Sequence, residues 1–438
     1  MYKVFFITFG CKVNQYETEC LRSCFVEKGF VSAENESEAD VFVVNSCTVT
    51  GSGDSKSLYA VRRLRRSYPR AVIALTGCLP QAAPETAEKC PEADVVTGTK
   101  EREKLVGLVM NALESGECCT EIVPYGKSDS FEDIPCPVGF SESGRTRAFM
   151  KIQDGCNQFC SYCIIPYARG RCRSKSLDSL RTEAQRLAQS GHRELVLVGI
   201  NLAFYGQEYG LRLVDAVETC CAVEGIERVR LGSLEPEMIS DDDLERLSRL
   251  PEFCPQFHLS LQSGSDGVLR RMNRKYNTDD YFALVCRIRS RFPDAAFTTD
   301  IMVGFPQETE EEFAESMAFA EKVGFAKIHV FQYSPRKGTV AARLPQLHKS
   351  VKAERAGRMK SLGDALQEKY LKSLVGKTVP VLFERENESD FYHGYAPDYT
   401  LIKIFRKKCE KSLRNMIFCV TIEVSGHDCC YGSICDSP

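Results

Sequence analysis

The chain has 438 residues, 22 of them cysteine, and a formal net charge of −3 at neutral pH. This length suits about two to four domains. The charge balance excludes a uniformly basic protein, so any contact with nucleic acid must come from local patches. The N-terminal segment MYKVFFITFG lacks the pattern of a signal peptide, and no apolar run has the length of a membrane span. We therefore expect a cytoplasmic protein without a membrane partner, whose cysteines hold metal more readily than they form disulfides.

The first third of the chain alternates apolar runs with amphipathic segments. Continuous apolar runs are typical of buried parallel strands. The predicted strands are residues 2–9, 40–45, 71–76 and 94–96, with helices near residues 14–28, 56–67 and 102–113 and after Pro80. Such a βαβ series predicts a doubly wound parallel sheet.

Three cysteines each follow a predicted strand directly, in TFGC, VNSC and LTGC: Cys11, Cys47 and Cys78. Because the carboxyl ends of parallel strands meet at one edge of the sheet, these thiols are expected to converge. Cysteine is also a common small buried residue, but three in register favour metal binding. We predict an auxiliary iron–sulfur cluster in which one iron lacks a protein ligand.

Residues 115–145 are polar and rich in Gly, Pro and Ser, which predicts a linker. A second strand–helix series follows. Its predicted strands are residues 148–152, 194–198, 228–231, 256–261, 297–303 and 327–332, with helices at 177–189, 241–249, 278–291 and 308–323. Six βα units predict a partial TIM-type barrel with its site at the carboxyl ends of the strands.

An amphipathic helix over residues 349–374 precedes a change of pattern. Short alternating segments at 378–385, 391–397, 400–405 and 417–424 predict a small all-β module. The predicted organisation is an α/β domain at 1–114, a linker at 115–145, a partial barrel at 146–374 and the β module at 375–438.

The run DGCNQFCSYC contains three cysteines spaced C-x3-C-x2-C: Cys156, Cys160 and Cys163. Three thiolates from one loop would leave one iron of a [4Fe–4S] cluster open for chemistry. The alternative is a zinc knuckle, which needs a fourth ligand. Cys172 lies nearby, but a set of four built that way would leave the first cysteine group unexplained. The spacing resembles that of radical S-adenosylmethionine (SAM) enzymes, in which the open iron binds the amino and carboxylate groups of SAM.

Several segments together resemble the radical-SAM methylthiotransferases over nearly the whole chain. They are TFGCKVNQYETE, VNSCTVT, TGCLPQ, DGCNQFCSYCIIPYARGR, LVGINLAFYG, LSLQSGSDGVLRRMNRKY and DIMVGFPQET. The resemblance implies an N-terminal α/β domain with an auxiliary [4Fe–4S] cluster, a radical-SAM partial barrel with a second [4Fe–4S] cluster, and a C-terminal TRAM barrel that holds RNA. KVNQYETE and IIPYARGR look like the branch that acts on N6-threonylcarbamoyladenosine beside the anticodon of tRNA.

The implied reaction places a methylthio group on C2 of that adenine and consumes two molecules of SAM. One methylates a sulfur on the auxiliary cluster, and the other gives the radical that removes the C2 hydrogen. An electron donor such as flavodoxin or ferredoxin and a sulfur source are implied as partners, and a monomer is expected. The alternatives are isopentenyladenosine in tRNA or an aspartate of a ribosomal protein as substrate, or a non-catalytic iron–sulfur protein that binds RNA.

Six residues are candidates for contact with SAM. Asn201, Glu235, Gln262 and Asp300 lie at or beyond the ends of predicted barrel strands, Arg274 offers a guanidinium to the carboxylate, and Gly199 permits close approach of the backbone. Each is alternatively a solvated loop residue or a satisfied buried polar group.

Local basic and aromatic clusters are the candidates for RNA contact, although a charge run is more often a solvated face. They comprise residues 62–66, Arg169, Arg171 and Arg173, residues 403–411, and Tyr392, Tyr395 and Tyr399. The tail adds His427, Cys429, Cys430 and Cys435, for which a zinc site is the less favoured interpretation.

Overall fold

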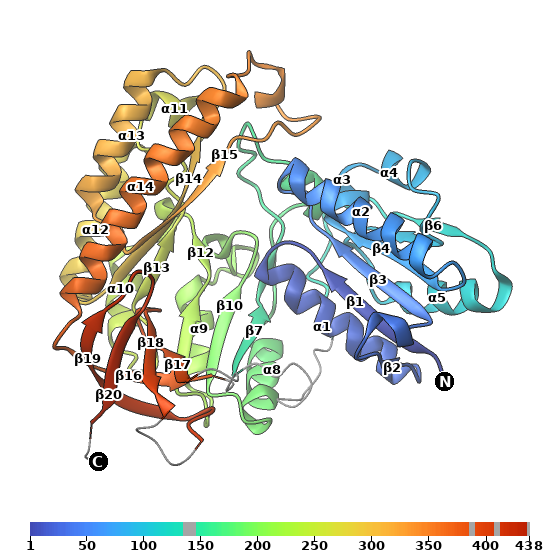
Figure 1. Cartoon of the computed structure of the whole chain (residues 1–438), viewed down its shortest axis with the longest axis horizontal. Helices are drawn as coiled ribbons and strands as arrows, with labels where there is room; N and C mark the ends of the chain where they lie inside the picture. Colours follow the sequence, from blue (N-terminus) through green and yellow to red (C-terminus); the bar gives the residue numbers. More distant parts are fainter. Residues whose placement is uncertain (135–145, 385–389, 407–411, 436–438) are drawn as a thin grey trace.

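A computed structural model describes residues 1–134, 146–384, 390–406 and 412–435. Figure 1 shows an N-terminal α/β part in blue, a central crescent of strands and helices from green to orange, and a small red barrel. The predicted fold class is confirmed: a parallel N-terminal sheet, a partial (βα)6 barrel and a small closed β-barrel. The domain limits given above stay a prediction.

The N-terminal sheet has the strand order β2-β1-β3-β4-β5-β6, and every pair is parallel. Its strands are β1 (Lys3–Thr8), β2 (Val31–Ser32), β3 (Val41–Ser46), β4 (Val72–Gly77), β5 (Val95–Thr97) and β6 (Cys119–Glu121). The edge strand β6 lies inside the stretch predicted as linker. Because the chain turns in opposite directions from β1 and β3, the switch point of the sheet falls between them, where folds of this kind bind ligands.

Helices cover both faces of this sheet. They are α1 (Lys12–Glu27), η1 (Glu36–Glu38), α2 (Gly51–Ser67), α3 (Cys78–Ala82), α4 (Glu85–Glu88) and α5 (Lys104–Ser115). Alternate strand residues supply two cores: Val41 and Val43 pack with α1 and α5, whereas Phe42 and Val44 pack with α2. Helix α1 also packs against the first barrel strand, so it lies between the two larger parts of the molecule (Figure 1).

The partial barrel consists of two adjoining parallel sheets, ordered β11-β10-β7 and β12-β13-β14-β15. Its strands are β7 (Arg147–Lys151), β10 (Glu194–Val198), β11 (Arg228–Leu231), β12 (Ser233–Leu234), β13 (Gln256–Leu259), β14 (Ala296–Val303) and β15 (Lys327–Gln332). The six predicted strands are confirmed, and β12 is an addition. A parallel bridge between Val229 and Phe253 joins the two sheets.

The helices of the barrel cover its outer face, where most of the large apolar core lies. They are α7 (Ile165–Arg169), α8 (Leu177–Gln189), η2 (Leu202–Phe204), η3 (Gln207–Tyr209), α9 (Leu213–Cys221), η4 (Pro236–Met238), α10 (Asp241–Ser248), α11 (Asp266–Arg271), α12 (Thr278–Arg291), α13 (Glu310–Val323), η5 (Ala341–Arg343) and α14 (Lys349–Ser373). Capping boxes begin α10, α12 and α13. The antiparallel pair β8 (Gln153–Asp154) and β9 (Arg173–Ser174) encloses the loop with the three closely spaced cysteines.

The C-terminal part is a closed barrel with the order β16-β17-β18-β20-β19. Its strands are β16 (Thr378–Phe383), β17 (Phe391–Tyr395), β18 (Leu401–Phe405), β19 (Ile417–Ser425) and β20 (Cys430–Ile434). The sequence prediction missed β20, because its run CYGSI contains Gly432, whose added Cβ would lie 2.2 Å from the Thr421 carbonyl oxygen. Cys430, one of the residues considered for a zinc site, is fully buried in the barrel core. Its side chain therefore has a packing role.

Two arginines of β11 in the partial barrel donate hydrogen bonds to the C-terminal β-barrel. Arg228 donates to the carbonyl oxygens of Tyr395 and Pro380 at 2.8 and 2.7 Å, and Arg230 donates to that of Pro397 at 2.7 Å. Within the described residues, no helix combines the length and the apolar character needed to cross a lipid bilayer.

Candidate active site

The first cysteine group lies at one edge of the N-terminal sheet. Cys11 follows β1, Cys47 follows β3, and Cys78 begins α3 directly after β4. Gly10 has φ +104°, and an added Cβ there would lie 2.9 Å from the Cys47 sulfur, so the Cys11 turn and Cys47 are in close contact. The structure thus brings Cys11 and Cys47 together at the switch point of the sheet, and Cys78 follows the neighbouring strand β4.

Burial raises the pKa of two thiols of this group, those of Cys47 and Cys78. It raises the pKa of Cys78 to about 11, although the neighbouring Arg169 guanidinium acts in the opposite direction. A metal ligand must be a thiolate, so metal binding at this edge has to displace protons.

The second cysteine group occupies the loop between β8 and α7. Gly155 precedes it with φ +72°, and a Cβ there would lie 1.9 Å from the Arg171 carbonyl oxygen, so only glycine fits where the two ends of the loop meet. The Cys163 N–H donates to the Cys160 carbonyl at 3.0 Å, which holds the loop tightly curled. Burial raises the pKa of Cys163 to about 12.

Two of the predicted SAM residues hydrogen-bond the sulfurs of this loop. The Asn201 side-chain amide donates to the Cys156 sulfur at 3.6 Å, and Arg274 donates to the Cys160 sulfur at 3.3 Å. Arg274 also forms an ion pair with Glu235, another of the predicted residues. Hydrogen bonds to sulfur ligands are one of the means by which a protein tunes an iron–sulfur cluster.

The other three predicted SAM residues lie further from the loop. Asp300 accepts an ion-pair contact from His258 at 3.3 Å, and Gln262 donates its backbone N–H to the Asp300 carbonyl at 2.9 Å. Gly199 lies at the end of β10, where a Cβ would approach the Gln153 side-chain oxygen to 2.9 Å. That oxygen accepts the N–H groups of the two residues after Gly199, so Gln153 fixes this turn.

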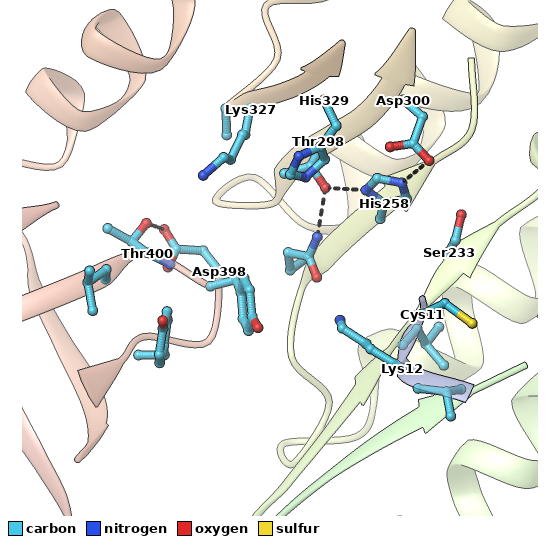
Figure 2. A pocket seen from close by; sticks show the side chains of 18 of the residues that line it. Cys11, Lys12, Ser233, His258, Thr298, Asp300, Lys327, His329, Asp398 and Thr400 are labelled. Atoms are coloured by element: carbon cyan, nitrogen blue, oxygen red, sulfur yellow. Dashed lines mark hydrogen bonds and ion pairs between the residues drawn. The ribbon is translucent and has the colours of Figure 1, made fainter. Parts of the chain in front are cut away.

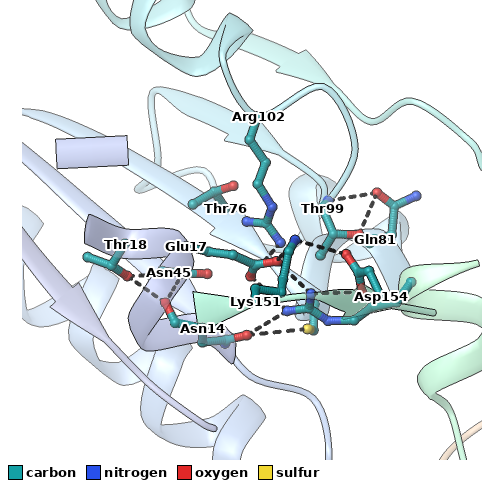
Figure 3. A network of polar contacts seen from close by, with 12 residues as sticks. Asn14, Glu17, Thr18, Asn45, Thr76, Gln81, Thr99, Arg102, Lys151 and Asp154 are labelled. Atoms are coloured by element: carbon teal, nitrogen blue, oxygen red, sulfur yellow. Dashed lines mark hydrogen bonds and ion pairs between the residues drawn. The ribbon is translucent and has the colours of Figure 1, made fainter. Parts of the chain in front are cut away.

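A buried polar network joins α1 to β7 and β8 (Figure 3). At its centre Glu17 of α1 accepts two hydrogen bonds from Arg169, at 2.7 and 2.8 Å, and one from Lys151 at 3.0 Å. Arg169 also donates to the Asn14 side-chain oxygen at 2.7 Å, to which the Cys78 sulfur is adjacent at 3.9 Å. Arg169 ends the helix that begins directly after the second cysteine loop, and its side chain reaches from that helix to the surroundings of Cys78.

This network has more positive than negative charges. Its cations are Arg102, Lys151, Arg169 and Arg173, and its anions are Glu17, Asp154 and the adjacent Glu132. The Arg102 guanidinium lies 2.9 Å from Glu17, yet none of its three nitrogens has a hydrogen bond of acceptable geometry. A buried surplus of positive charge beside the first cysteine group favours a negatively charged occupant there.

A cavity of about 720 Å3 opens on the inner face of the barrel (Figure 2). Its volume is in the range of small-molecule sites. Cys11 and Lys12 border it from the N-terminal part, the small barrel contributes Asp398 to Leu401, and Gly199 lies in its wall. The strands β13, β14 and β15 contribute a polar wall that consists of Gln256, His258, Thr298, Asp300, Lys327 and His329.

Two of the three carboxylates that line the cavity, Asp300 and Asp398, have partners of their own. His258 lies between Thr298, at 2.9 Å from its Nδ1, and Asp300, at 3.3 Å from its Nε2. On the opposite side Asp398 accepts hydrogen bonds from the hydroxyls of Tyr370 and Thr400 at 2.6 and 2.7 Å. The wall is therefore polar and largely preorganised on both sides.

Comparison with known proteins assigns the chain to a family. Residues 150–320 match the radical SAM superfamily, and residues 3–98 match a family described as "Uncharacterized protein family UPF0004". Over 426 residues the chain is 38% identical to "Threonylcarbamoyladenosine tRNA methylthiotransferase MtaB" of Bacillus subtilis, which covers 95% of this chain and 93% of the relative. It is 36% identical to "tRNA-2-methylthio-N(6)-dimethylallyladenosine synthase" of Caldicellulosiruptor saccharolyticus, which covers 86% and 81%.

The chain belongs to the radical-SAM tRNA methylthiotransferases. Solved structures agree at the level of the fold. The radical SAM methyltransferase TsrM from Kitasatospora setae superposes with a TM-score of 0.55 at 13% identity, over 76% of this chain and 73% of that one. The cobalamin-dependent radical enzyme OxsB gives a TM-score of 0.50 at 11% identity, over 84% and 56%.

Membership of this family implies SAM and a [4Fe–4S] cluster, and the residues of the methylthiotransferase fit both. The second cysteine group has hydrogen-bond donors aimed at two of its sulfurs, as a thiolate-bound cluster requires. No group of three His, Cys, Asp or Glu side chains in the described ranges is set to hold a single metal ion.

The structure also corrects several of the sequence interpretations about RNA. Tyr392 is buried in the core of the small barrel, so it offers no stacking surface. Arg169 and Arg173 are buried and form ion pairs with Glu17 and Asp154, so neither is available to contact RNA. In the run at 62–66, Arg63 and Arg65 pair with Glu36 and Asp94. Of residues 403–411, those from 407 onward lie outside the described residues.

Sequence reasoning missed the residues that line the cavity and the centre of the network. Lys12 and Glu17 lie in the segment KVNQYETE, which was used for the family resemblance without a role for either residue. His258 and His329 lie two residues after Gln256 and Lys327 in the alternating runs QFHL and KIHV, so each histidine shares a strand face with another polar residue. Polar residues facing the inside of a parallel barrel are the signal that could have identified this wall.

Proposed function

We propose that this methylthiotransferase modifies C2 of N6-threonylcarbamoyladenosine next to the anticodon of tRNA, in the cytoplasm, with two [4Fe–4S] clusters and two molecules of SAM. The observation that carries the proposal is the pair of cysteine groups, together with a polar cavity that opens beside Cys11 of the first group. Relatives bearing the corresponding name support the choice of nucleoside.

The two cysteine groups have different roles in this proposal. Cys156, Cys160 and Cys163 hold the cluster that supplies the electron for cleavage of SAM. The first group, at the edge of the N-terminal sheet, holds an auxiliary cluster. The surplus of buried cations beside Cys78 supports this second assignment, because thiolate-bound clusters carry negative charge.

The six SAM candidates divide into two sets. Asn201 and Arg274 orient the loop sulfurs, and Glu235 holds Arg274 in place. Gly199 and Asp300 border the cavity in which the adenosyl part and the substrate base would meet, and Gln262 is hydrogen-bonded to the Asp300 backbone. An electron donor such as flavodoxin or ferredoxin and a sulfur source complete the set of proposed partners.

Isopentenyladenosine in tRNA is the second candidate substrate, because relatives with that activity in their names are 35–37% identical to this chain. The polar cavity wall favours threonylcarbamoyladenosine, since an isopentenyl group offers no hydrogen-bonding partner to it.

Mass spectrometry of tRNA nucleosides tests the substrate directly. A strain that lacks the gene should lose 2-methylthio-threonylcarbamoyladenosine, and complementation should restore it. Loss of the isopentenyl counterpart alone would overturn the proposed nucleoside and keep the reaction.

A cysteine pair tests the cluster assignment. In the reconstituted enzyme Cys163→Ala should abolish formation of 5′-deoxyadenosine and lower the iron content from about eight to about four atoms per chain. The neighbouring Cys172→Ala is the matched control and should change neither quantity. Undiminished cleavage of SAM by the Cys163 variant would refute the assignment.

A further inference from the structure

Lys12 is a cation without an anionic partner at the border of the cavity. Its ammonium lies 5.6 Å from the centroid of the Tyr399 ring and 5.9 Å from that of Phe149. Among the described residues no carboxylate is within ion-pair distance of it, and Figure 2 shows the side chain extending from beside Cys11 into the open space. The aromatic rings hold the cation without neutralising it.

The side chains around Lys12 add to its positive field. Tyr399 is a non-glycine residue with φ +70°, a backbone conformation that costs energy and is frequent at functional sites. Its ring is contacted by Arg147 at 5.0 Å and by Arg230 at 4.6 Å as well as by Lys12. Each of these arginines is paired with a glutamate of its own, whereas Lys12 is not.

The cavity therefore offers an anion receptor at one defined place. Asp300 is engaged by His258, and Asp398 is engaged by two hydroxyls and a backbone N–H, so neither needs Lys12. A ligand with a carboxylate beside Lys12 would accept a charge-assisted hydrogen bond from its ammonium, in place of the water molecules that otherwise solvate that ammonium.

The position beside Cys11 sets which part of a substrate reaches the ammonium. If the auxiliary cluster delivers sulfur to C2 of adenine, then C2 lies near Cys11, and only N1 separates C2 from C6 in the ring. The substituent on N6 therefore begins close to the reacting edge. In threonylcarbamoyladenosine that substituent ends in a carboxylate, whereas an isopentenyl group ends in methyl groups.

We propose that Lys12 is the receptor for the threonyl carboxylate and is the residue that selects threonylcarbamoyladenosine over adenosines with an uncharged N6 substituent. This inference rests on the proposed function. Lys12 binds the part of the substrate that does not react, so its contribution belongs to binding more than to the chemical step.

The test compares anticodon stem-loop RNAs that differ only at one adenosine: threonylcarbamoyladenosine, its methyl ester, or isopentenyladenosine. The reconstituted enzyme is assayed for KM and kcat. RNA dissociation constants are measured by fluorescence anisotropy without reductant, so that no turnover occurs. The variants are Lys12→Met, Lys12→Arg and, as the matched control, Lys322→Met. The Lys322 ammonium also lies over an aromatic ring, 4.2 Å from the centroid of Phe282, but Lys322 does not line the cavity.

We expect Lys12→Met to weaken binding of the acid-bearing RNA by about 10- to 100-fold and to raise its KM similarly, with little change in kcat. Binding of the methyl ester should stay unchanged. Lys12→Arg should keep the preference for acid over ester, and Lys322→Met should behave like the wild type. The acid-to-ester ratio is internal to each variant, so it is insensitive to differences in iron content.

Two outcomes overturn different statements. An acid-to-ester ratio in Lys12→Met equal to that of the wild type would refute the role of Lys12 and leave the proposed function intact. Wild-type enzyme that methylthiolates the isopentenyl RNA and not the acid-bearing RNA would refute the proposed nucleoside, and the receptor with it.

Discussion

The buried network and the cavity both collect charged side chains where the N-terminal part meets the barrel, but they pair them differently. In the network Glu17 is 2% exposed and contacts three cations. In the cavity the ammonium of Lys12 extends into open space, and no carboxylate of the described residues forms an ion pair with it. Buried pairs are costly to break, whereas unpaired polar groups around a cavity are available to a ligand. We therefore expect substitutions in the network to change stability and substitutions in the cavity to change recognition.

The largest effect is expected from Glu17→Gln. This change leaves Arg102, Lys151 and Arg169 buried without their shared carboxylate, which should lower the free energy of unfolding by about 3–5 kcal/mol. Chemical denaturation measures it. The control is Glu19→Gln on the same helix, whose pair with Arg22 is partly exposed and is worth no more than about 1 kcal/mol.

The same residue predicts a dependence on pH. Burial by itself raises the pKa of Glu17, but Arg102, Arg169 and Lys151 outweigh it and bring this pKa to about 2. The pKa of Glu17 is lower in the folded protein than in the unfolded chain, where it is about 4.3. Glu17 therefore contributes its full stabilisation, roughly 3 kcal/mol, above that pH, and the contribution is lost as the pH falls toward 2. The difference in stability between wild type and Glu17→Gln should therefore shrink from pH 5 to pH 3. A constant difference would contradict the pairing.

A smaller effect is expected where the two larger parts of the molecule touch beyond Cys47. Arg336 donates to the Asp54 carboxylate at 2.5 Å and to the Thr48 hydroxyl at 2.7 Å, and Ser334 accepts the Gly51 N–H at 3.1 Å. Because Arg336 is 11% exposed, Arg336→Met should cost about 1–3 kcal/mol. Hydrogen exchange should accelerate at the start of α2 and remain unchanged in α13. Uniform acceleration of both helices would indicate global destabilisation instead.

The cysteine groups were predictable because each has a local signal. Cys156, Cys160 and Cys163 share one loop, and the first group follows strands that are recognisable as apolar runs. Parallel topology alone then places that group at one edge. The βα units were predictable for the same reason, since hydrophobic periodicity is a property of a few adjacent residues.

The network and the cavity have no such signal. The contact between Glu17 and Arg169 joins residues 152 positions apart, and that between Glu17 and Lys151 joins residues 134 apart. Both depend on how α1 docks against β7, which no local pattern encodes. The same holds for Arg169, which reads as a basic residue near a loop and becomes fully buried only when the two parts meet. Residues of this kind follow from tertiary packing, and their chemistry has to be read from the structure.

The smallest effect is expected in the cavity, from the substitution Asp300→Asn. Burial lowers the pKa of His329 in the cavity wall, Asp300 raises it in part, and His258, Lys327 and Lys12 lower it further. Asp300→Asn removes the one opposing charge, so the pKa of His329 should fall further below its usual value. The chain has six histidines, so NMR with 13C-labelled histidine can follow this titration. Asp300 is 30% exposed, and its substitution should change the free energy of unfolding by less than about 1 kcal/mol. A large loss of stability with an unmoved His329 would mean that the cavity wall, like the network, is built for stability, and the distinction between the two regions would be wrong.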